Sequence, residues 1–170
     1  MTTRDAALTA RPRRSFELGK YLPFRLTLLS NRLTRRVSLF YGDRFRLSAP
    51  EWRTMAVLGQ NGPMTANLVI RQTTMDKVRV SRAVAQLLKN GYITRDSDPA
   101  DRRRAVLALT PAGLDIYRQI VPLVQDVEAE VMADLTREER VHLETALGKL
   151  EAFLERSSEP VAVEEDSIEE

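Results

Sequence analysis

Apolar residues recur along much of the chain at intervals of three and four, the spacing that places them on one side of an α-helix. In the first such stretch they are Leu22, Leu26, Leu29, Leu33, Val37 and Phe40. The interval predicts one long helix with a single apolar stripe. We expect Gly42 to end this helix.

Three further helices are predicted by residues that commonly start or stop helices. The segment from Ser48 to Glu51 reads as a capping box with proline in the first turn, and it opens a helix that stops at the sequence GQNGP. Thr65 is expected to open a short third helix, ANLVIRQ. Thr74 is expected to start a fourth helix, MDKVRVSRAVAQLLKN, which Gly91 terminates.

After Gly91 the pattern changes to two short runs rich in β-forming residues, YITR and AVLAL. The segment DPADRRR, residues 98–104, separates them. It is too long for a two-residue turn, so we expect a hairpin that projects a basic loop.

Two helices follow the hairpin. Thr110 and Pro111 open the first, which has Pro122 inside it as an expected kink. Its helical stripe consists of Tyr117, Ile120, Val124, Val127 and Val131. A second capping box, from Thr136 to Glu139, opens the last helix. The stripe of this helix consists of Leu143, Leu147, Leu150 and Leu154.

Charge is distributed unevenly along the 170 residues. The formal net charge is only +2, but residues 157–170 hold six acidic residues and neither lysine nor arginine, which leaves 26 basic against 18 acidic residues elsewhere. A basic body with an acidic end is typical of a protein that meets a polyanion. We expect residues 1–17 to form a basic disordered arm and residues 157–170 an acidic disordered tail.

Several classes of protein find no support in the sequence. With no cysteine there is no disulfide, thiolate zinc site or thiol redox switch. The single histidine, His142, lies among charged residues, and no nucleotide-binding, hydrolase or zinc-protease motif is present, so we expect neither an enzyme nor a metal or cofactor. No apolar run is long enough for a membrane span or a signal core, which predicts a soluble, unexported protein of the cytoplasm.

Three helices followed by a two-stranded hairpin with a long basic tip form a winged helix-turn-helix, which lays one helix in the DNA major groove. On a helical wheel of residues 75–90, one side gathers Val80, Val84, Leu87 and Leu88. The opposite side centres on Arg82. We expect DNA contacts from Thr74, Lys77, Val78, Arg79, Ser81, Arg82 and Gln86. The alternative is a basic face that is merely solvated.

The loop DPADRRR then has a function beside a helix bound in the groove. A hairpin tip there reaches the neighbouring minor groove, whose negative potential attracts guanidinium groups. We expect Asp101 to hold Arg103 extended while Arg102 and Arg104 contact sugar and phosphate, and we include Arg95 among the wing contacts.

The stretch DKVRVSRAVAQLLKNGYITRDSDPADRRRAVLALTPAG resembles the MarR family of bacterial regulators. The matching features are a VSR-type recognition helix, a Gly-Tyr-Ile-x-Arg turn into the wing, a D-x-R wing tip and an LTxxG helix start. The resemblance covers about residues 22–154. It implies a mainly α (α+β) fold, a winged helix-turn-helix with a two-stranded β wing, whose N- and C-terminal helices intertwine into a homodimer. It assigns the wing salt bridge and minor-groove insertion to Asp101 and Arg103.

By this resemblance, residues 18–156 form one domain, with the winged part at about 46–110 and dimerisation helices at 18–45 and 111–156. The stripes on the first, fifth and last helices also exceed what the winged module can cover by itself, which favours a dimer independently. The implied function is a repressor that binds double-stranded DNA at a pseudo-palindromic operator and is released by a small ligand.

Ligands of the family bind between the winged module and the dimerisation helices. The corresponding residues are Arg25, Ser30, Arg32, Trp52, Met55 and Tyr117. Arginine with aromatic groups suits an aromatic acid, and MDKVRVSRAV resembles regulators of aromatic-acid catabolism; a coenzyme A thioester of such an acid is equally open. Ordinary core aromatics and interhelical ion pairs are the alternative. A winged module without an effector, a protein-interaction module and an activator also remain open.

Overall fold

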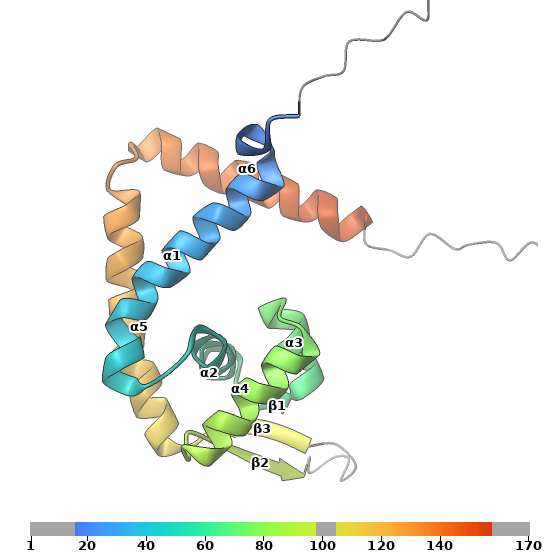
Figure 1. The fold of residues 1–170 in the computed structure, drawn as a ribbon, viewed down its shortest axis with the longest axis vertical. Helices are drawn as coiled ribbons and strands as arrows, with labels where there is room; N and C mark the ends of the chain where they lie inside the picture. The colour runs from blue at the N-terminus through green and yellow to red at the C-terminus, as the bar shows by residue number, and fades with distance from the viewer. Residues whose placement is uncertain (1–15, 98–104, 158–170) are drawn as a thin grey trace, which may run out of the picture. The chain divides into compact units, whose positions relative to one another are not determined.

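The computed structural model describes residues 16–97 and 105–157, and internal contacts divide the chain into two compact units with the boundary between Leu123 and Val124. The elements, in chain order, are η1 (Leu18–Lys20), α1 (Leu22–Phe45), α2 (Ala49–Asn61), β1 (Met64–Thr65), α3 (Ala66–Thr73), α4 (Lys77–Lys89), β2 (Ile93–Ser97), β3 (Ala105–Leu109), α5 (Pro111–Met132) and α6 (Arg137–Ser157) (Figure 1). The order of helices and hairpin is the one that the sequence predicts.

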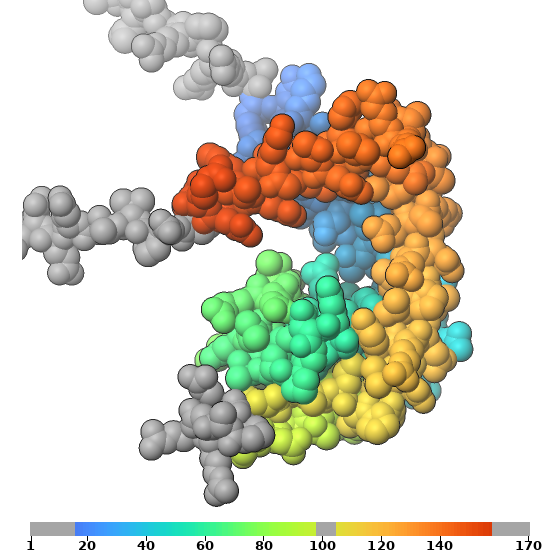
Figure 2. All heavy atoms as spheres, turned by 180° about the vertical axis from the view of Figure 1, so that it is seen from behind, coloured from blue at the N-terminus to red at the C-terminus, as the bar shows by residue number. Residues whose placement is uncertain are grey.

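Helices α2, α3 and α4 and a small antiparallel sheet form one body within the first unit (Figures 1 and 2). The strand order is β1-β3-β2, with Ile93 opposite Leu109 in the register of β2 and β3. The core of this body contains Met55, Leu58, Met64, Val69, Val80, Val84, Leu87, Ile93 and Leu107, all buried. One hydrophobic core therefore fixes all three helices on the sheet.

The sheet has three strands, whereas the sequence predicts only the two of the hairpin. The additional strand β1 consists of Met64 and Thr65, which pair with Leu107 and Val106 of β3. Two residues are too few to produce an alternating pattern in the sequence. Their extended conformation depends on pairing with a strand that lies about forty residues further along the chain.

Both predicted capping boxes are confirmed. The backbone N–H of Ser48 donates to Glu51 Oε2 at 2.8 Å at the start of α2, and the N–H of Thr136 donates to Glu139 Oε2 at 2.8 Å before α6. The hydrogen bonds from Thr136 hold the pKa of Glu139 below its usual value. Each box satisfies N–H groups that the first turn of a helix leaves without a partner.

The end of α1 differs from the prediction. The helix continues through Gly42 to Phe45, and the chain turns at Arg46, whose φ of 52° and ψ of 40° are left-handed. A glycine inside a helix costs only about 1 kcal/mol. Tyr41, before the glycine, and Leu47, after it, are both buried. Burying both side chains requires the chain to stay helical past Gly42 before it turns, and this burial outweighs the cost of the glycine.

The start of α4 also differs. Asp76, rather than Thr74, is the N-cap, and its Oδ1 accepts the N–H of Arg79 at 2.7 Å. Thr74 is instead the left-handed C-cap of α3, with a φ of 54°. Thr74 and Asp76 both favour the N-cap position of a helix. Because Thr74 belongs to the tight turn between α3 and α4, the helix begins only after Asp76.

Three aromatic rings connect α1, α2 and α5 within the first unit. Trp52 lies 5.8 Å from Tyr41 and 6.0 Å from Tyr117, measured between ring centroids, and stacks on Tyr117 at an interplanar angle of 26°. Burial raises the pKa of Tyr41, against an opposing effect of the Arg53 guanidinium. A Cβ at Gly59 would lie 2.7 Å from the Tyr117 ring, so this glycine makes room for the stack.

The base of the wing is joined to the start of α5 by hydrogen bonds. The N–H of Thr110 donates to the carbonyl of Tyr92 at 3.0 Å, its hydroxyl donates to the carbonyl of Gly91 at 2.8 Å, and the N–H of Gly113 donates to that hydroxyl at 3.0 Å. A Cβ on Gly113 would overlap the carbonyl oxygen of Tyr92. The LTPAG segment thus combines a helix cap with a close backbone contact.

The second unit contains the end of α5 and the whole of α6. Pro122 lies inside α5, directly before the boundary between the units. Val127 is buried, whereas the predicted stripe of α6 is exposed, and Leu147 and Leu150 each retain 39% of their accessible surface. No helix in the described ranges is long and apolar enough to cross a membrane.

The contact at Gly113 gives a prediction about stability. Gly113→Ala should lower the free energy of unfolding by about 1–3 kcal/mol, because the new methyl group overlaps the Tyr92 carbonyl and forces the hairpin base away from α5. Gly148→Ala is the matched control, since its Cβ meets nothing within 4 Å and alanine favours the helix by about 0.5–1 kcal/mol. Chemical denaturation measures the free energy of unfolding of both variants and of the wild type. Equal stability of the Gly113 variant and the wild type would contradict the assigned contact.

Candidate nucleic-acid interface

Helix α4 is held by one face. Its buried residues are Val80, Ala83, Val84 and Leu87, each with at most 6% of its surface accessible. They pack against the core formed with α2, α3 and the sheet. The opposite face is consequently presented to solvent in a fixed rotation about the helix axis, as the helical wheel predicts.

All seven side chains predicted to contact DNA are exposed. Six of them, Lys77, Val78, Arg79, Ser81, Arg82 and Gln86, belong to α4. Thr74 does not, because it caps α3, and its hydroxyl donates to the carbonyl of Thr73 at 2.7 Å. Val78, the apolar residue of this set, has 58% of its surface accessible, and an apolar side chain on this face can contact a thymine methyl group.

The polar side chains of α4 differ in their partners. Arg79 Nε lies 3.2 Å from Asp76 Oδ2, and Gln86 donates to the side chain of Asn90 at 3.1 Å. Within residues 16–97 and 105–157, neither Lys77 nor Arg82 makes an ion pair. Lys77 and Arg82 can therefore bind an external acceptor without first breaking an internal ion pair.

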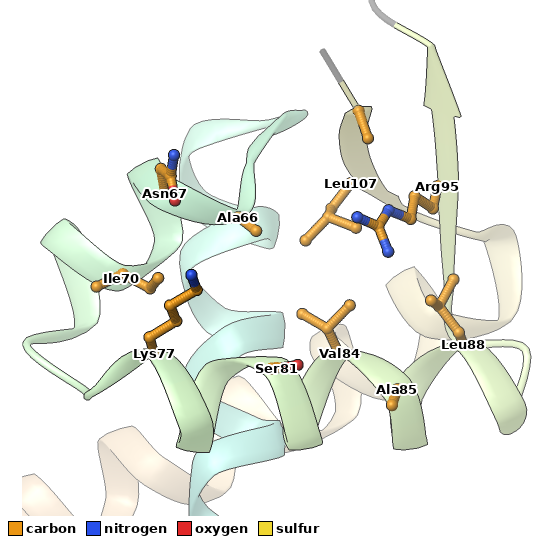
Figure 3. Close-up of a pocket in the computed structure, with 11 residues that line it drawn as sticks. Ala66, Asn67, Ile70, Lys77, Ser81, Val84, Ala85, Leu88, Arg95 and Leu107 are labelled. Carbon is orange, nitrogen blue, oxygen red and sulfur yellow. The ribbon is translucent and has the colours of Figure 1, made fainter. Parts of the chain in front are cut away.

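A hollow of about 350 Å³ lies between α3, α4 and the sheet, where the side chains of Lys77, Ser81 and Arg95 approach from α4 and the wing (Figure 3). Its floor is apolar and includes Val84, Leu88, Ile70 and Leu107. The hollow brings the predicted wing residue Arg95, on β2, close to the predicted helix residues. Cations from two elements thus share one edge of the α4 face.

The wing tip lies outside the described residues. This applies to Asp101, Arg102, Arg103 and Arg104 and to the pairing that the sequence predicts for them. Strands β2 and β3 do pair up to Ser97 and Ala105, so the hairpin that carries the tip is present beside α4.

The residues predicted for a ligand fall into three groups in the first unit. Trp52, Met55 and Tyr117 belong to the aromatic stack and core, with Met55 fully buried. Arg25 and Arg32 share a hollow of about 420 Å³ on α1 whose other residues are mainly leucines. Ser30 is exposed and lines neither this hollow nor the stack.

Arg46 is a residue that the sequence analysis did not single out. It lines a further hollow together with Arg79, Arg82 and Gln86 of α4. No pattern in the sequence indicates it, because the predicted end of α1 at Gly42 leaves the position of Arg46 undefined. The chain turns at Arg46 in a left-handed conformation, and its side chain lines the same hollow as these residues of α4.

These elements define a winged helix-turn-helix protein, in which a helix anchored on one side presents a cationic face beside a β hairpin. Comparison with known proteins agrees. The model of the MarR family matches residues 47–104. The repressor NicR of Pseudomonas putida is 25% identical over 105 residues, covering 62% of this chain and 66% of NicR.

Solved structures match a larger share of the chain. BpsR of Bordetella bronchiseptica, described with the regulation of its DNA binding by 6-hydroxynicotinic acid, has a TM-score of 0.71 at 22% identity and covers 80% of this chain and 96% of its own. A mutant of Escherichia coli MarR in complex with operator DNA has a TM-score of 0.68 at 25% identity, covering 80% and 99%.

The family match over residues 47–104, the curated relatives and the solved structures together support a MarR family winged-helix transcriptional regulator. Its curated relatives are named as transcriptional regulators, and the family is not enzymatic. The mainly helical winged helix-turn-helix expected from the sequence is confirmed, with β1 as an addition.

The position of Arg82 generates a prediction about specificity. Arg82→Ala should weaken binding to the preferred DNA sequence by about 1–3 kcal/mol and relax the preference at one base pair per half-site, because a guanidinium can bond guanine O6 and N7 together. Binding to a set of single-substituted duplexes measures this preference. Lys89→Ala, further along the same exposed side, is the control. A uniform loss across all duplexes would assign Arg82 to a phosphate instead.

Proposed function

We propose that the chain is a homodimeric repressor that binds a pseudo-palindromic operator in double-stranded DNA and is released by a small ligand. The observation that carries the proposal is the cationic face of α4, which is exposed beside Arg95 while its opposite face is buried. The B-DNA major groove is wide enough to admit one α-helix. The proposed place of action is the cytoplasm, where such DNA is found.

The wing completes the DNA interface in this proposal. Arg103 enters the minor groove, Asp101 holds it extended, and Arg102 and Arg104 contact phosphates. Support comes from the sequence of the tip and from the hairpin, whose described strands end at Ser97 and Ala105. Arg95 contributes a further cation at the base of the wing.

A second copy of the chain is the proposed partner of the apolar faces on α1 and α6. On α1, Leu22, Leu26 and Leu29 are exposed, and on α6, Leu143, Leu147, Leu150 and Leu154 are exposed. An exposed apolar face on each of these two helices favours an interface. We therefore retain residues 18–156 as one functional domain, with dimerisation helices at 18–45 and 111–156 around the winged part.

The effector that we propose is a small aromatic acid. Support comes from BpsR, which 6-hydroxynicotinic acid regulates, and from the hollow on α1 that combines Arg25 and Arg32 with leucines. Guanidinium groups bind a carboxylate, and the apolar lining suits a ring. A coenzyme A thioester of such an acid is the alternative ligand.

Other functions of the same fold are distinguishable. An activator would bind the same operator but raise transcription from it. A winged module without an effector would hold its operator in the presence of every acid tested. A protein-interaction module would show no sequence-specific DNA binding at all.

The proposed dimer predicts a linked loss of assembly and DNA binding. Leu147→Asp should produce monomers and weaken operator binding strongly, because it places an unpaired charge in the interface. Thr145→Asp, on the opposite side of α6, is the matched control and should leave both properties nearly unchanged. Light scattering measures the assembly state, and titration with operator DNA measures binding. A Leu147 variant that remains dimeric would rule out this face as the interface.

The proposed effector predicts release of DNA by an aromatic acid. A panel that includes 6-hydroxynicotinic acid and its coenzyme A thioester should contain a compound that weakens operator binding. Arg25→Gln and Arg32→Gln should each reduce the response about tenfold or more, since a hydrogen bond to a charged group contributes about 1.5–3 kcal/mol. Arg118→Gln, elsewhere on the surface, should leave the response unchanged. An equal response of all variants would move the effector site away from α1.

A further inference from the structure

A hollow of about 550 Å³ lies between the junction of α1 and α2 and the exposed side of α4. Arginines from two elements line it: Arg46 from the junction, and Arg79 and Arg82 from α4. Among the described residues that line it, Glu51 is the only acidic one. The hollow therefore carries an excess of positive charge.

Two carboxylates in or beside the elements that line this hollow are already engaged. Glu51 Oε2 accepts the backbone N–H of Ser48 at 2.8 Å, and Asp76 pairs with Arg79 at 3.2 Å. Among the described residues, Arg46 makes no ion pair. The guanidinium of Arg46 is thus an exposed cation close to two others, an arrangement that an external anion would stabilise.

The hollow borders one side of the exposed face of α4. At about 100° per residue, Arg82 lies near the centre of the exposed face of α4, with Arg79 and Gln86 on one flank and Lys77, Ser81 and Ala85 on the other. The second flank borders the hollow shared with Arg95, and the first borders the hollow shared with Arg46. A helix in the major groove has a phosphate strand on each side.

We propose that Arg46 binds a DNA phosphate at the edge of the major groove, on the side of α4 away from the wing. Its contact is independent of base sequence and fixes the depth and register of α4, while Arg82 reads bases. The proposal rests on the DNA-binding function proposed above. It adds the α1–α2 junction to the interface as a backbone anchor opposite Lys77 and Arg95.

The left-handed backbone of Arg46 provides variants that remove the cation without damaging the fold. Glycine and asparagine adopt this conformation more readily than arginine. Arg46→Gly and Arg46→Asn should therefore unfold at the same temperature as the wild type or at a higher one. Any loss of DNA binding in them is then separate from a loss of structure.

The test uses the full chain with an operator duplex and an unrelated duplex over a range of salt concentrations. Arg46→Asn and Arg46→Gly should weaken binding to both duplexes by a similar factor, about threefold to tenfold at moderate salt, and should reduce the salt slope by about one unit. The ratio between the two duplexes should not change. Arg53→Gln is the control, because Arg53 bonds Thr34 Oγ1 at 3.1 Å and does not line the hollow.

Three outcomes would overturn the inference. Unchanged affinity and salt slope in folded Arg46 variants would remove Arg46 from the interface. A loss confined to one base pair would make it a base contact. In the third outcome, inorganic phosphate raises the unfolding temperature of the wild type but not of the Arg46 variants. If these variants also keep full DNA affinity, the hollow would be assigned to a free anion. A wild-type chain that binds no DNA would instead overturn the proposed function, and this inference with it.

Discussion

The burial of one face of α4 is the constraint on which the DNA interface depends. Helix α4 packs against α2, α3 and β2, and its residues Val80 and Leu87 have 1% and 0% of their surface accessible. A rotation of α4 by one residue would expose them and would cost several kcal/mol of burial. The same packing that stabilises the module therefore fixes the direction in which Arg82 and Val78 point.

The two edges of this exposed face are built from different parts of the chain. One edge combines Lys77 with Arg95 of the wing, and the other combines Arg79 with Arg46 of the α1–α2 junction. The wing is itself joined at its base to α5 through Tyr92, Thr110 and Gly113. Helices α1 and α5 are thus each connected to one edge of the face through a short junction, at Arg46 for α1 and at Thr110 for α5.

Much of this arrangement could be predicted from the sequence because local signals determine it. The capping boxes at Ser48 and Thr136 and the wheel centred on Arg82 involve residues close together in the chain, and the structure confirms them. The family motifs also identify the wing and the class of protein.

The errors arise where distant contacts decide between local options. The helix passes Gly42 with Tyr41 buried before it and Leu47 buried after it, and β1 exists only because β3 pairs with it. Asp76 prevails over Thr74 as a cap because the turn after α3 is left-handed. Arg46 could not be identified for the same reason, since its place beside α4 depends on where α1 ends.

Selection of the full chain against random-sequence DNA duplexes tests the central claim most directly. The account predicts an enriched motif of two inverted half-sites whose centres are about 10–10.5 bp apart, since the two recognition helices of a dimer meet the same face of the duplex. Enrichment of no sequence, or of a single half-site bound by one chain, would contradict it.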